Sequence, residues 1–113
     1  MPYISTMTNQ AISAQTEVLL KEQLGEAIAL IPGKSESWLM LSFQEKTPLY
    51  FRGEACPCVY AEVKLFGSAG DAVYDSLTAR LTQLYADALA VPPENIYVKY
   101  EEVSHWGWNG RNF

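Results

Sequence analysis

The sequence predicts an α+β (α/β) fold in which a β-α-β unit occurs twice, giving one four-stranded sheet with two helices on one face. Strand-like and helix-like segments alternate in the same order in both halves of the 113 residues. The two helical segments also end alike, in residues 29–32 and 88–92, before a few polar residues and a strand. Right-handed crossovers would place both helices on the same face. Residues 1–113 are therefore expected to form a single domain.

The first half predicts a strand, a helix and a second strand. Residues 3–9 are rich in β-branched and aromatic side chains, which favours a short strand. Ser13 is a candidate helix N-cap, and Pro32-Gly33 ends the helix. Residues 37–44 form an almost continuous apolar run, which favours a strand covered on both faces. The apolar side of the helix is expected to comprise Leu20, Leu24, Ala27, Ile28 and Ile31.

The second half repeats this order. Residues 58–66 alternate apolar and polar side chains, as in a half-buried strand. Residues 67–71 interrupt the alternation and open a second helix, which ends at Val91-Pro92-Pro93. Residues 96–103 predict the last strand, and residues 49–51 a very short one between the halves. The apolar stripe of the second helix is expected to comprise Val73, Leu77, Leu81, Leu84 and Ala88.

Two helices on one face leave the other face of the sheet without a covering layer. The predicted strands contain so many apolar residues that this face is not expected to remain in water. A sheet with helices on one side only needs a second layer. Association between copies of the chain supplies that layer most simply, so an oligomer is expected.

Composition argues against several classes of partner. The net charge is −5, and the eight Lys and Arg residues are scattered, which argues against binding to nucleic acid. No apolar run approaches the roughly 20 residues that a membrane-spanning helix needs. The first residues lack the basic and apolar regions of a secretory signal. A cytoplasmic protein is expected, and its release from a cell would need a non-classical route.

Neither the cysteines nor the histidine predicts a metal or cofactor site. Cys56 and Cys58 are separated by one residue, a proline, and not by the two residues of a Cys-x-x-Cys redox motif, so structural thiols are expected. His105 is the only histidine and has no second or third ligand around it, which argues against zinc. The sequence also lacks a phosphate-binding glycine loop and a dinucleotide fingerprint. The expected function therefore needs no metal and no cofactor.

Several short motifs occur together in a specific order along the chain. Pro2 directly follows the initiator Met, Gly33-Lys34 follows the first helix, and a cysteine pair enters the middle strand. Near the end, residues 96–98 (Ile-Tyr-Val) precede residues 107–109 (Gly-Trp-Asn) and a terminal Phe. In these features the whole chain resembles the macrophage migration inhibitory factor family of the tautomerase superfamily. The resemblance implies a duplicated β-α-β subunit packed as a homotrimer, with active sites between neighbouring subunits.

The resemblance further implies that Pro2 is the catalytic group. Removal of Met1 is expected because the second residue is small, and it would expose a secondary amine. An α-amino group ordinarily has a pKa of about 7.7–8.0, and burial in an apolar pocket disfavours its charged form. A neutral amine can remove a proton from a carbon beside a carbonyl and return it elsewhere. With Met1 retained, the nitrogen of Pro2 is an amide and cannot act as a base.

A lysine and a tyrosine also match the family's site. Lys34 has two interpretations: a solvated lysine favoured by the helix dipole, or a cation that binds a substrate carboxylate or polarises the carbonyl. The match at Gly33-Lys34 favours the second. In the family the tyrosine that matches Tyr97 reaches the neighbouring subunit's site. Lys99 stands where many relatives carry Asn, and it is expected to add a positive charge near the pocket.

Aromatic residues are expected to line a slot for a flat ligand. The alternative is that they simply pack the trimer. The two interpretations weigh equally for Trp108, whereas the pocket is favoured for Trp106, which replaces a smaller aliphatic residue of the family. The residues assigned to the slot are Trp38, Val63, Trp106, Trp108 and Phe113.

These assignments predict a keto–enol tautomerase of aryl α-keto acids of the phenylpyruvate kind, with dopachrome-type isomerisation as a further reaction. Pro2 would act as base and then acid, Lys34 would bind the carboxylate, and the aromatic residues would hold the ring. A cytokine-like protein or mimic that contacts a host receptor, its pocket vestigial, is the alternative. A third hypothesis is a binding protein that retains the pocket without turnover.

Overall fold

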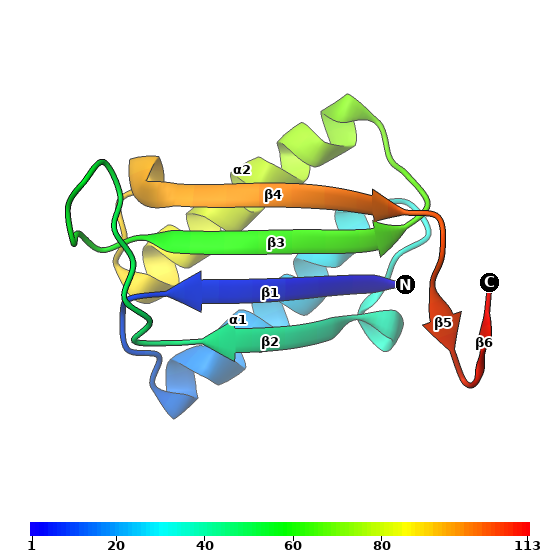
Figure 1. Ribbon diagram of the computed structural model, residues 1–113, viewed down its shortest axis with the longest axis horizontal. Helices are drawn as coiled ribbons and strands as arrows, with labels where there is room; N and C mark the ends of the chain where they lie inside the picture. The colour runs from blue at the N-terminus through cyan, green and yellow to red at the C-terminus, as the bar shows by residue number, and fades with distance from the viewer.

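The computed structural model describes residues 1–113, and its centre is one mixed four-stranded sheet (Figure 1). The strand order is β2-β1-β3-β4. β1 (Pro2–Thr8) runs parallel to β2 (Met40–Gln44) and antiparallel to β3 (Val59–Phe66), and β3 runs parallel to β4 (Ile96–Val103). Each parallel pair is joined through a helix, so the predicted duplicated β-α-β unit is confirmed.

Both helices pack on the same face of the sheet, as Figure 1 shows behind the strands. α1 (Ala14–Ala27) begins after Ser13, whose side-chain oxygen accepts a hydrogen bond from the backbone N–H of Thr16 at 3.1 Å. This confirms the predicted N-cap. α1 continues into a 3-10 turn, η1 (Ile28–Leu30), and α2 (Asp71–Leu89) is longer. Neither helix combines the length and apolar character that crossing a membrane requires.

The core lies between the helices and the sheet. All five apolar residues predicted for the first helical stripe are buried. In the second stripe the three leucines are buried, while Val73 and Ala88 are half-buried. Tyr85 was absent from the predicted stripe but is fully buried, and its hydroxyl hydrogen-bonds to the buried hydroxyl of Thr6 at 2.5 Å. That bond satisfies both polar groups inside the core.

Two strand predictions were wrong. Residues 37–44 do not form one strand covered on both faces, because a 3-10 turn, η2 (Glu36–Trp38), precedes β2. β2 is an edge strand of the sheet in this chain, and only one of its faces packs against the core. Residues 49–51 form no strand either: Phe51 makes an isolated bridge with Glu54 around a two-residue turn.

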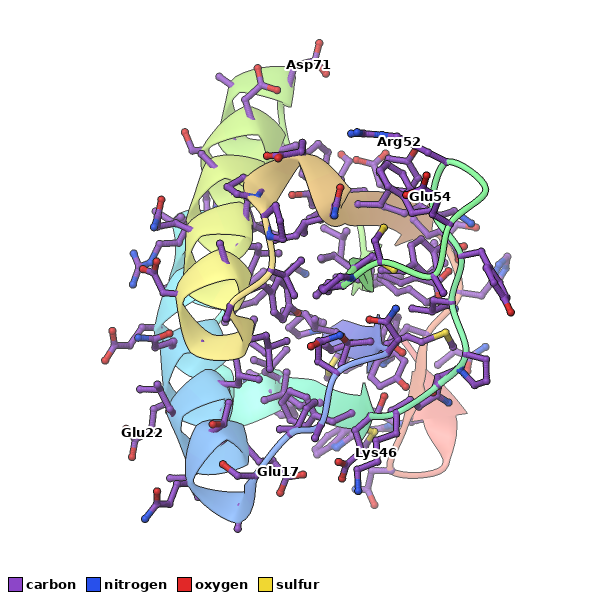
Figure 2. The ribbon with its side chains drawn as sticks, turned by 90° about the vertical axis from the view of Figure 1, so that its left-hand side faces the viewer. Glu17, Glu22, Lys46, Arg52, Glu54 and Asp71 are labelled. Atoms are coloured by element: carbon purple, nitrogen blue, oxygen red, sulfur yellow. The ribbon has the colours of Figure 1, made fainter.

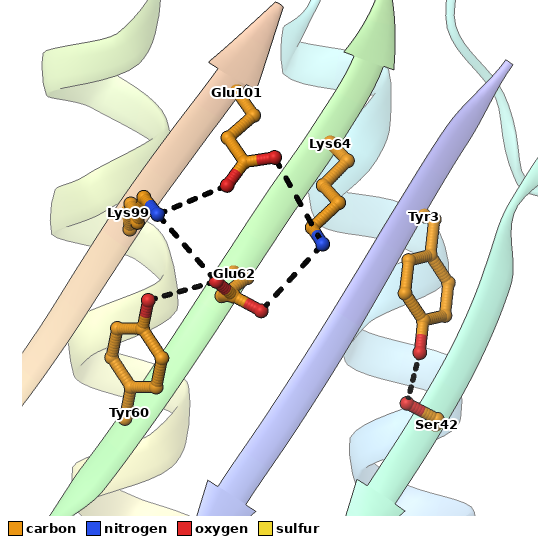
Figure 3. Close-up of polar contacts among 7 residues, drawn as sticks. All are labelled: Tyr3, Ser42, Tyr60, Glu62, Lys64, Lys99 and Glu101. Carbon is orange, nitrogen blue, oxygen red and sulfur yellow. Dashed lines mark hydrogen bonds and ion pairs between the residues drawn. The ribbon is translucent and has the colours of Figure 1, made fainter. Parts of the chain in front are cut away.

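The sheet face away from the helices carries a charged cluster on β3 and β4, so this part is more polar than the sequence led us to expect. Lys99 Nζ lies 3.0 Å from Glu101 and 3.8 Å from Glu62, and Lys64 Nζ lies 3.8 Å from Glu62 (Figure 3). Tyr60 donates a hydrogen bond to Glu62 at 2.8 Å. The alternate residues of β3, from Val59 to Leu65, point the other way, into the core. Met40 and Tyr97 are apolar or aromatic residues that remain exposed, at 69% and 59%. The charged cluster covers only the β3 and β4 part of this face, so the prediction of an oligomer is left untested by the single chain.

The aromatic tail forms a small hairpin of β5 (Gly107–Trp108) and β6 (Arg111–Asn112). Its turn is Asn109-Gly110, with φ values of 52° and 88°. Two residues with positive φ form the turn that matches the twist of a hairpin, and Asn-Gly is its preferred sequence. The hairpin lies at the end of the sheet where β1 begins (Figure 1), so it brings the tail's aromatic rings close to the N-terminus.

Candidate functional site

A hollow of about 790 Å³ lies at the N-terminal end of β1. The start of β1 forms one part of its wall, η2 with the beginning of β2 forms a second part, and the tail hairpin forms a third. All three tryptophans of the chain line it, although they come from sequence positions far apart. The lining includes Met1, Pro2, Trp38, Met40, Trp106 and Trp108.

Aromatic rings form a continuous series beside the hollow. The rings of Trp38 and Trp108 meet edge to face, with centroids 5.0 Å apart and an interplanar angle of 81°. Trp108 stacks with Phe113 at 6.3 Å, and Phe113 lies 5.8 Å from Phe66. Trp38, Trp108 and Phe113 are 46%, 49% and 58% exposed. Much of this aromatic surface is thus available to a ligand.

Lys34 lies where the end of β3 meets the start of β1. Gly33 precedes it with a φ of 82°, a left-handed conformation that suits glycine at the end of a helical segment. The ammonium of Lys34 donates a hydrogen bond to the carbonyl oxygen of Phe66 at 2.8 Å. The N–H of Phe66 in turn donates to the carbonyl oxygen of Met1 at 3.1 Å. These bonds hold a cation beside the N-terminus.

The N-terminal amine of Met1 is perturbed by these surroundings. Burial, the larger cause, and the neighbouring Lys34 ammonium lower its pKa from 8.0 to about 6. Both effects disfavour the charged form, since one removes water and the other places a like charge nearby. Pro2 follows Met1 and is buried. The amine of Met1 is therefore largely in its neutral form at pH 7.

Six of the nine residues predicted for the site gather at this end of the sheet. Pro2, Trp38, Trp106 and Trp108 line the main hollow. Phe113 and Trp38 line a smaller adjoining hollow of about 260 Å³ with Met1, Gly33 and Phe66. The sixth is Lys34, held by Phe66.

The other three lie elsewhere in this chain. The side chain of Val63 is fully buried in the core, so it does not line the slot. Leu65 of β3 pairs with Pro2 on one side and with Glu102 of β4 on the other, so Glu102 marks the level of Pro2 on β4. Tyr97 lies five residues (102 − 97) before Glu102 on that strand. At about 3.3 Å per residue, Tyr97 is some 16 Å along the sheet from the hollow. Lys99 is on the open face, paired with Glu101 and Glu62.

Sequence reasoning missed Phe66. Its carbonyl anchors Lys34 and its ring contacts Phe113. The available signal was its position as the last residue of the alternating run 58–66, immediately before a glycine. A strand end beside the first strand can contribute backbone groups to a site, whereas alternation alone indicates only the face of each side chain.

The two thiols lie away from the hollow. Cys58 is buried and Cys56 half-buried, and no disulfide joins them. Asn9 bridges this segment: its amide donates to the carbonyl of Cys56 at 2.7 Å, and its side-chain oxygen accepts from the N–H of Cys58 at 3.1 Å. Burial, and then the neighbouring Cys56, raise the pKa of the Cys58 thiol. A raised pKa disfavours the nucleophilic thiolate, which agrees with structural thiols.

The duplicated β-α-β sheet, with its aromatic hollow around the chain's first residues, defines a protein of the tautomerase fold class. A family model described as "Macrophage migration inhibitory factor (MIF)" matches residues 1–113. The chain belongs to the macrophage migration inhibitory factor family, which includes tautomerases and cytokine-like proteins.

Individual relatives match this chain over nearly their full lengths. The chain is 30% identical over 115 residues to macrophage migration inhibitory factor of Meriones unguiculatus, covering 100% of this chain and 99% of the relative. It is 28% identical to the homolog from Brugia malayi, with the same coverage. Among solved structures, MIF2 of Leishmania major is 31% identical, with a TM-score of 0.93 and coverage of 100% of this chain and 97% of that chain. The Prochlorococcus marinus homologue is 28% identical, with a TM-score of 0.84 and coverage of 98% of each chain.

Proposed function

We propose that this protein is a cofactor-independent keto–enol tautomerase of aryl α-keto acids of the phenylpyruvate kind, with Pro2 as its base and acid. The observation that carries the proposal is the position of the N-terminal amine. The amine of Met1 lies beside an aromatic hollow and next to Lys34, where its pKa falls to about 6, and Pro2 is the next residue at the same end of β1. An amine is useful as a base only in its neutral form, and these surroundings favour that form at pH 7.

Removal of Met1 would make Pro2 the terminus and convert its nitrogen from an amide into a secondary amine. The ring leaves this amine little freedom, and β1 fixes its position. Its lone pair takes a proton from the carbon between the carbonyl and the aromatic ring. The protonated amine then returns that proton to the enolate oxygen, or the sequence runs in reverse. The substrate is only isomerised, so no further reactant is needed.

Lys34 has two roles in this proposal. An ammonium group has three donors, and the bond to Phe66 uses one, which leaves donors for a substrate carboxylate. The same positive charge disfavours protonation of the neighbouring amine. Carboxylate binding and base activation would thus depend on one side chain.

The aromatic series would hold the ring of the substrate. The ring planes of Trp38 and Trp108 are nearly perpendicular, at 81°, so a flat ligand could stack on one ring and meet the other edge to face. Both contribute to the hollow that contains Pro2. A dopachrome-type bicyclic substrate has the same flat shape and belongs to the same proposal.

The proposal includes a homotrimer in which Tyr97 of one subunit completes the site of the next. Tyr97 is 59% exposed and lies at the end of the sheet opposite Pro2. It can meet a site of this kind only in another copy of the chain. Family membership supports an oligomer, because proteins of this family typically form them.

The test is a ketonisation assay on enolic phenylpyruvate, with the N-terminal mass measured on the same sample. Protein that begins at Pro2 should accelerate ketonisation. Pro2→Gly keeps a free amine but loses the ring, so it should retain a small residual rate. An inactive protein with a verified Pro2 terminus would overturn the proposal.

A further inference from the structure

Three side chains stack at the end of the sheet opposite the hollow. The guanidinium of Arg52 lies over the ring of Phe51, 4.7 Å from its centroid. The ring of Phe51 meets that of Tyr97 edge to face, at 5.2 Å and 86°. The ring of Phe51 thus contacts both a cation and the exposed tyrosine.

The backbone beneath this stack is strained. Phe51 and Glu54 exchange two backbone hydrogen bonds, of 2.8 and 3.1 Å, around Arg52-Gly53. Both central residues have positive φ, 55° for Arg52 and 77° for Gly53. Such a turn favours Asn-Gly or Gly-Gly, and arginine is disfavoured at its first central position. A residue persists in a disfavoured conformation when its surroundings fix it there.

Those surroundings tie the turn to the strand that carries Tyr97. Arg52 Nη2 donates a hydrogen bond to the carbonyl oxygen of Glu94 at 3.2 Å. Glu94 belongs to a 3-10 turn, η3 (Pro93–Asn95), which leads directly into β4. Figure 2 shows Arg52 and Glu54 on the loop that crosses the side of the sheet away from the helices. Arg52 therefore links the loop to the start of β4, and Asn95 adds a second link through its hydrogen bond to the carbonyl oxygen of Pro57 at 2.9 Å.

We propose that Phe51 is a positioning residue for the reaction, which fixes the orientation of the Tyr97 ring, and that Arg52 holds Phe51 in place. This inference rests on the proposed function, in which Tyr97 contacts the substrate bound to a neighbouring subunit. An exposed tyrosine on an otherwise open sheet face samples several rotamers. The edge-to-face contact selects one of them before the substrate arrives, so less conformational entropy is lost on binding.

A double-mutant cycle tests this inference. Phe51→Leu keeps the apolar bulk of the side chain but removes its ring, and Phe51→Tyr restores a ring. In the wild-type background Phe51→Leu should lower kcat/KM by about three- to tenfold, the range expected for ordering one side chain. Phe51→Tyr should stay within about twofold of wild type. In the Tyr97→Ala background Phe51→Leu should have little further effect, because the ring it positions is gone.

The cycle separates failure of this inference from failure of the proposed function. If Tyr97→Ala lowers kcat/KM but Phe51→Leu does not, or if Phe51→Leu causes the same loss with and without Tyr97, the positioning role is wrong and the proposed function stands. If Tyr97→Ala leaves kcat/KM unchanged, the neighbouring-subunit role of Tyr97 is wrong, and this inference falls with it.

Two further variants distinguish positioning from stability. Tyr50→Ala removes the adjacent aromatic side chain, which is 74% exposed and outside the stack, so it should leave kcat/KM unchanged. Arg52→Gly relieves the disfavoured φ and removes the cation over Phe51. It should lower kcat/KM by about twofold or more at temperatures well below its Tm, consistent with an exposed cation–π contact. A loss of kcat/KM that appears only as the variant begins to unfold would show that the turn affects only stability.

Discussion

The ammonium of Lys34 lies 2.8 Å from the carbonyl oxygen of Phe66, and this bond places a fixed positive charge next to the N-terminus. Phe66 is itself bonded through its N–H to Met1. Two strand ends and one loop thus bring together an amine, a cation and an aromatic wall.

The pH dependence of turnover should report the titration of the N-terminal amine. The base is active when neutral, so kcat/KM should be low in acid and rise with pH through the pKa of the amine. An unperturbed α-amino group would give a midpoint near 8. Burial and Lys34 lower the pKa of the Met1 amine to about 6, and both should lower that of Pro2 in the same direction. A pH–rate profile with a midpoint at 8 or above would contradict this.

Lys34→Ala should lower turnover of carboxylate substrates more than that of their esters. A hydrogen bond to a charged group contributes about 1.5–3 kcal/mol, or about ten- to a hundredfold in kcat/KM. The same variant should move the pH–rate midpoint upward, because the neighbouring positive charge is removed. The measurement is kcat/KM for matched acid and ester substrates across pH.

Lys99→Ala is the matched control for that experiment. Lys99 is paired with Glu101 and Glu62 on the open sheet face (Figure 3). Its removal should affect acid and ester turnover equally. Equal losses with Lys34→Ala would show that Lys34 does not bind the carboxylate, and a selective loss with Lys99→Ala would assign that role to Lys99 instead.

Both cysteines should be dispensable for turnover. Cys56 and Cys58 lie near Asn9 and Asn95, apart from the residues around the hollow. The double variant Cys56→Ser/Cys58→Ser should ketonise substrate within a few-fold of wild type, with some loss of stability because Cys58 is buried. Thermal unfolding and kcat/KM on the same preparation check this. Inactivity of a folded double variant would reveal a role for the thiols.

The protein should be a homotrimer in solution. Tyr97 and Pro2 lie at opposite ends of the sheet, so a site that uses both needs more than one subunit. Multi-angle light scattering at micromolar concentration should give about three times the chain mass of 12.6 kDa. A stable monomer that still turns over substrate would contradict the proposed role of Tyr97.

Much of the fold was predictable because side-chain periodicity records which residues face the core. The spacing of Leu20, Leu24 and Ala27 identified the buried side of α1, and alternation along 58–66 identified β3. The same alternation places Val63 with Leu65 in the core. The resemblance alone suggested Val63 for the slot, and the period-2 pattern of its strand was the better guide.

Other features depend on tertiary placement that periodicity does not record. The apolar side chains of Trp38 and Met40 suggested that residues 37–44 form a strand covered on both faces. In the structure these two side chains line the hollow instead. The ion pairs of Lys64 with Glu101 and of Lys99 with Glu62 come from the register between β3 and β4, which are far apart in sequence, so this charged cluster was missed. The link between Lys34 and Phe66 spans 32 residues and involves a backbone carbonyl, which leaves no trace in side-chain patterns.

The central claim is that the free amine of Pro2 is the base, and one inserted residue tests it most directly. An alanine placed between Met1 and Pro2 would become the terminus after Met1 is removed, and would convert the Pro2 nitrogen into an amide. The account predicts that this protein, with its N-terminal mass verified, keeps the oligomeric state of wild type but loses ketonisation by about a hundredfold or more, the contribution expected of a general base. Wild-type kcat/KM in the extended protein would contradict the mechanism.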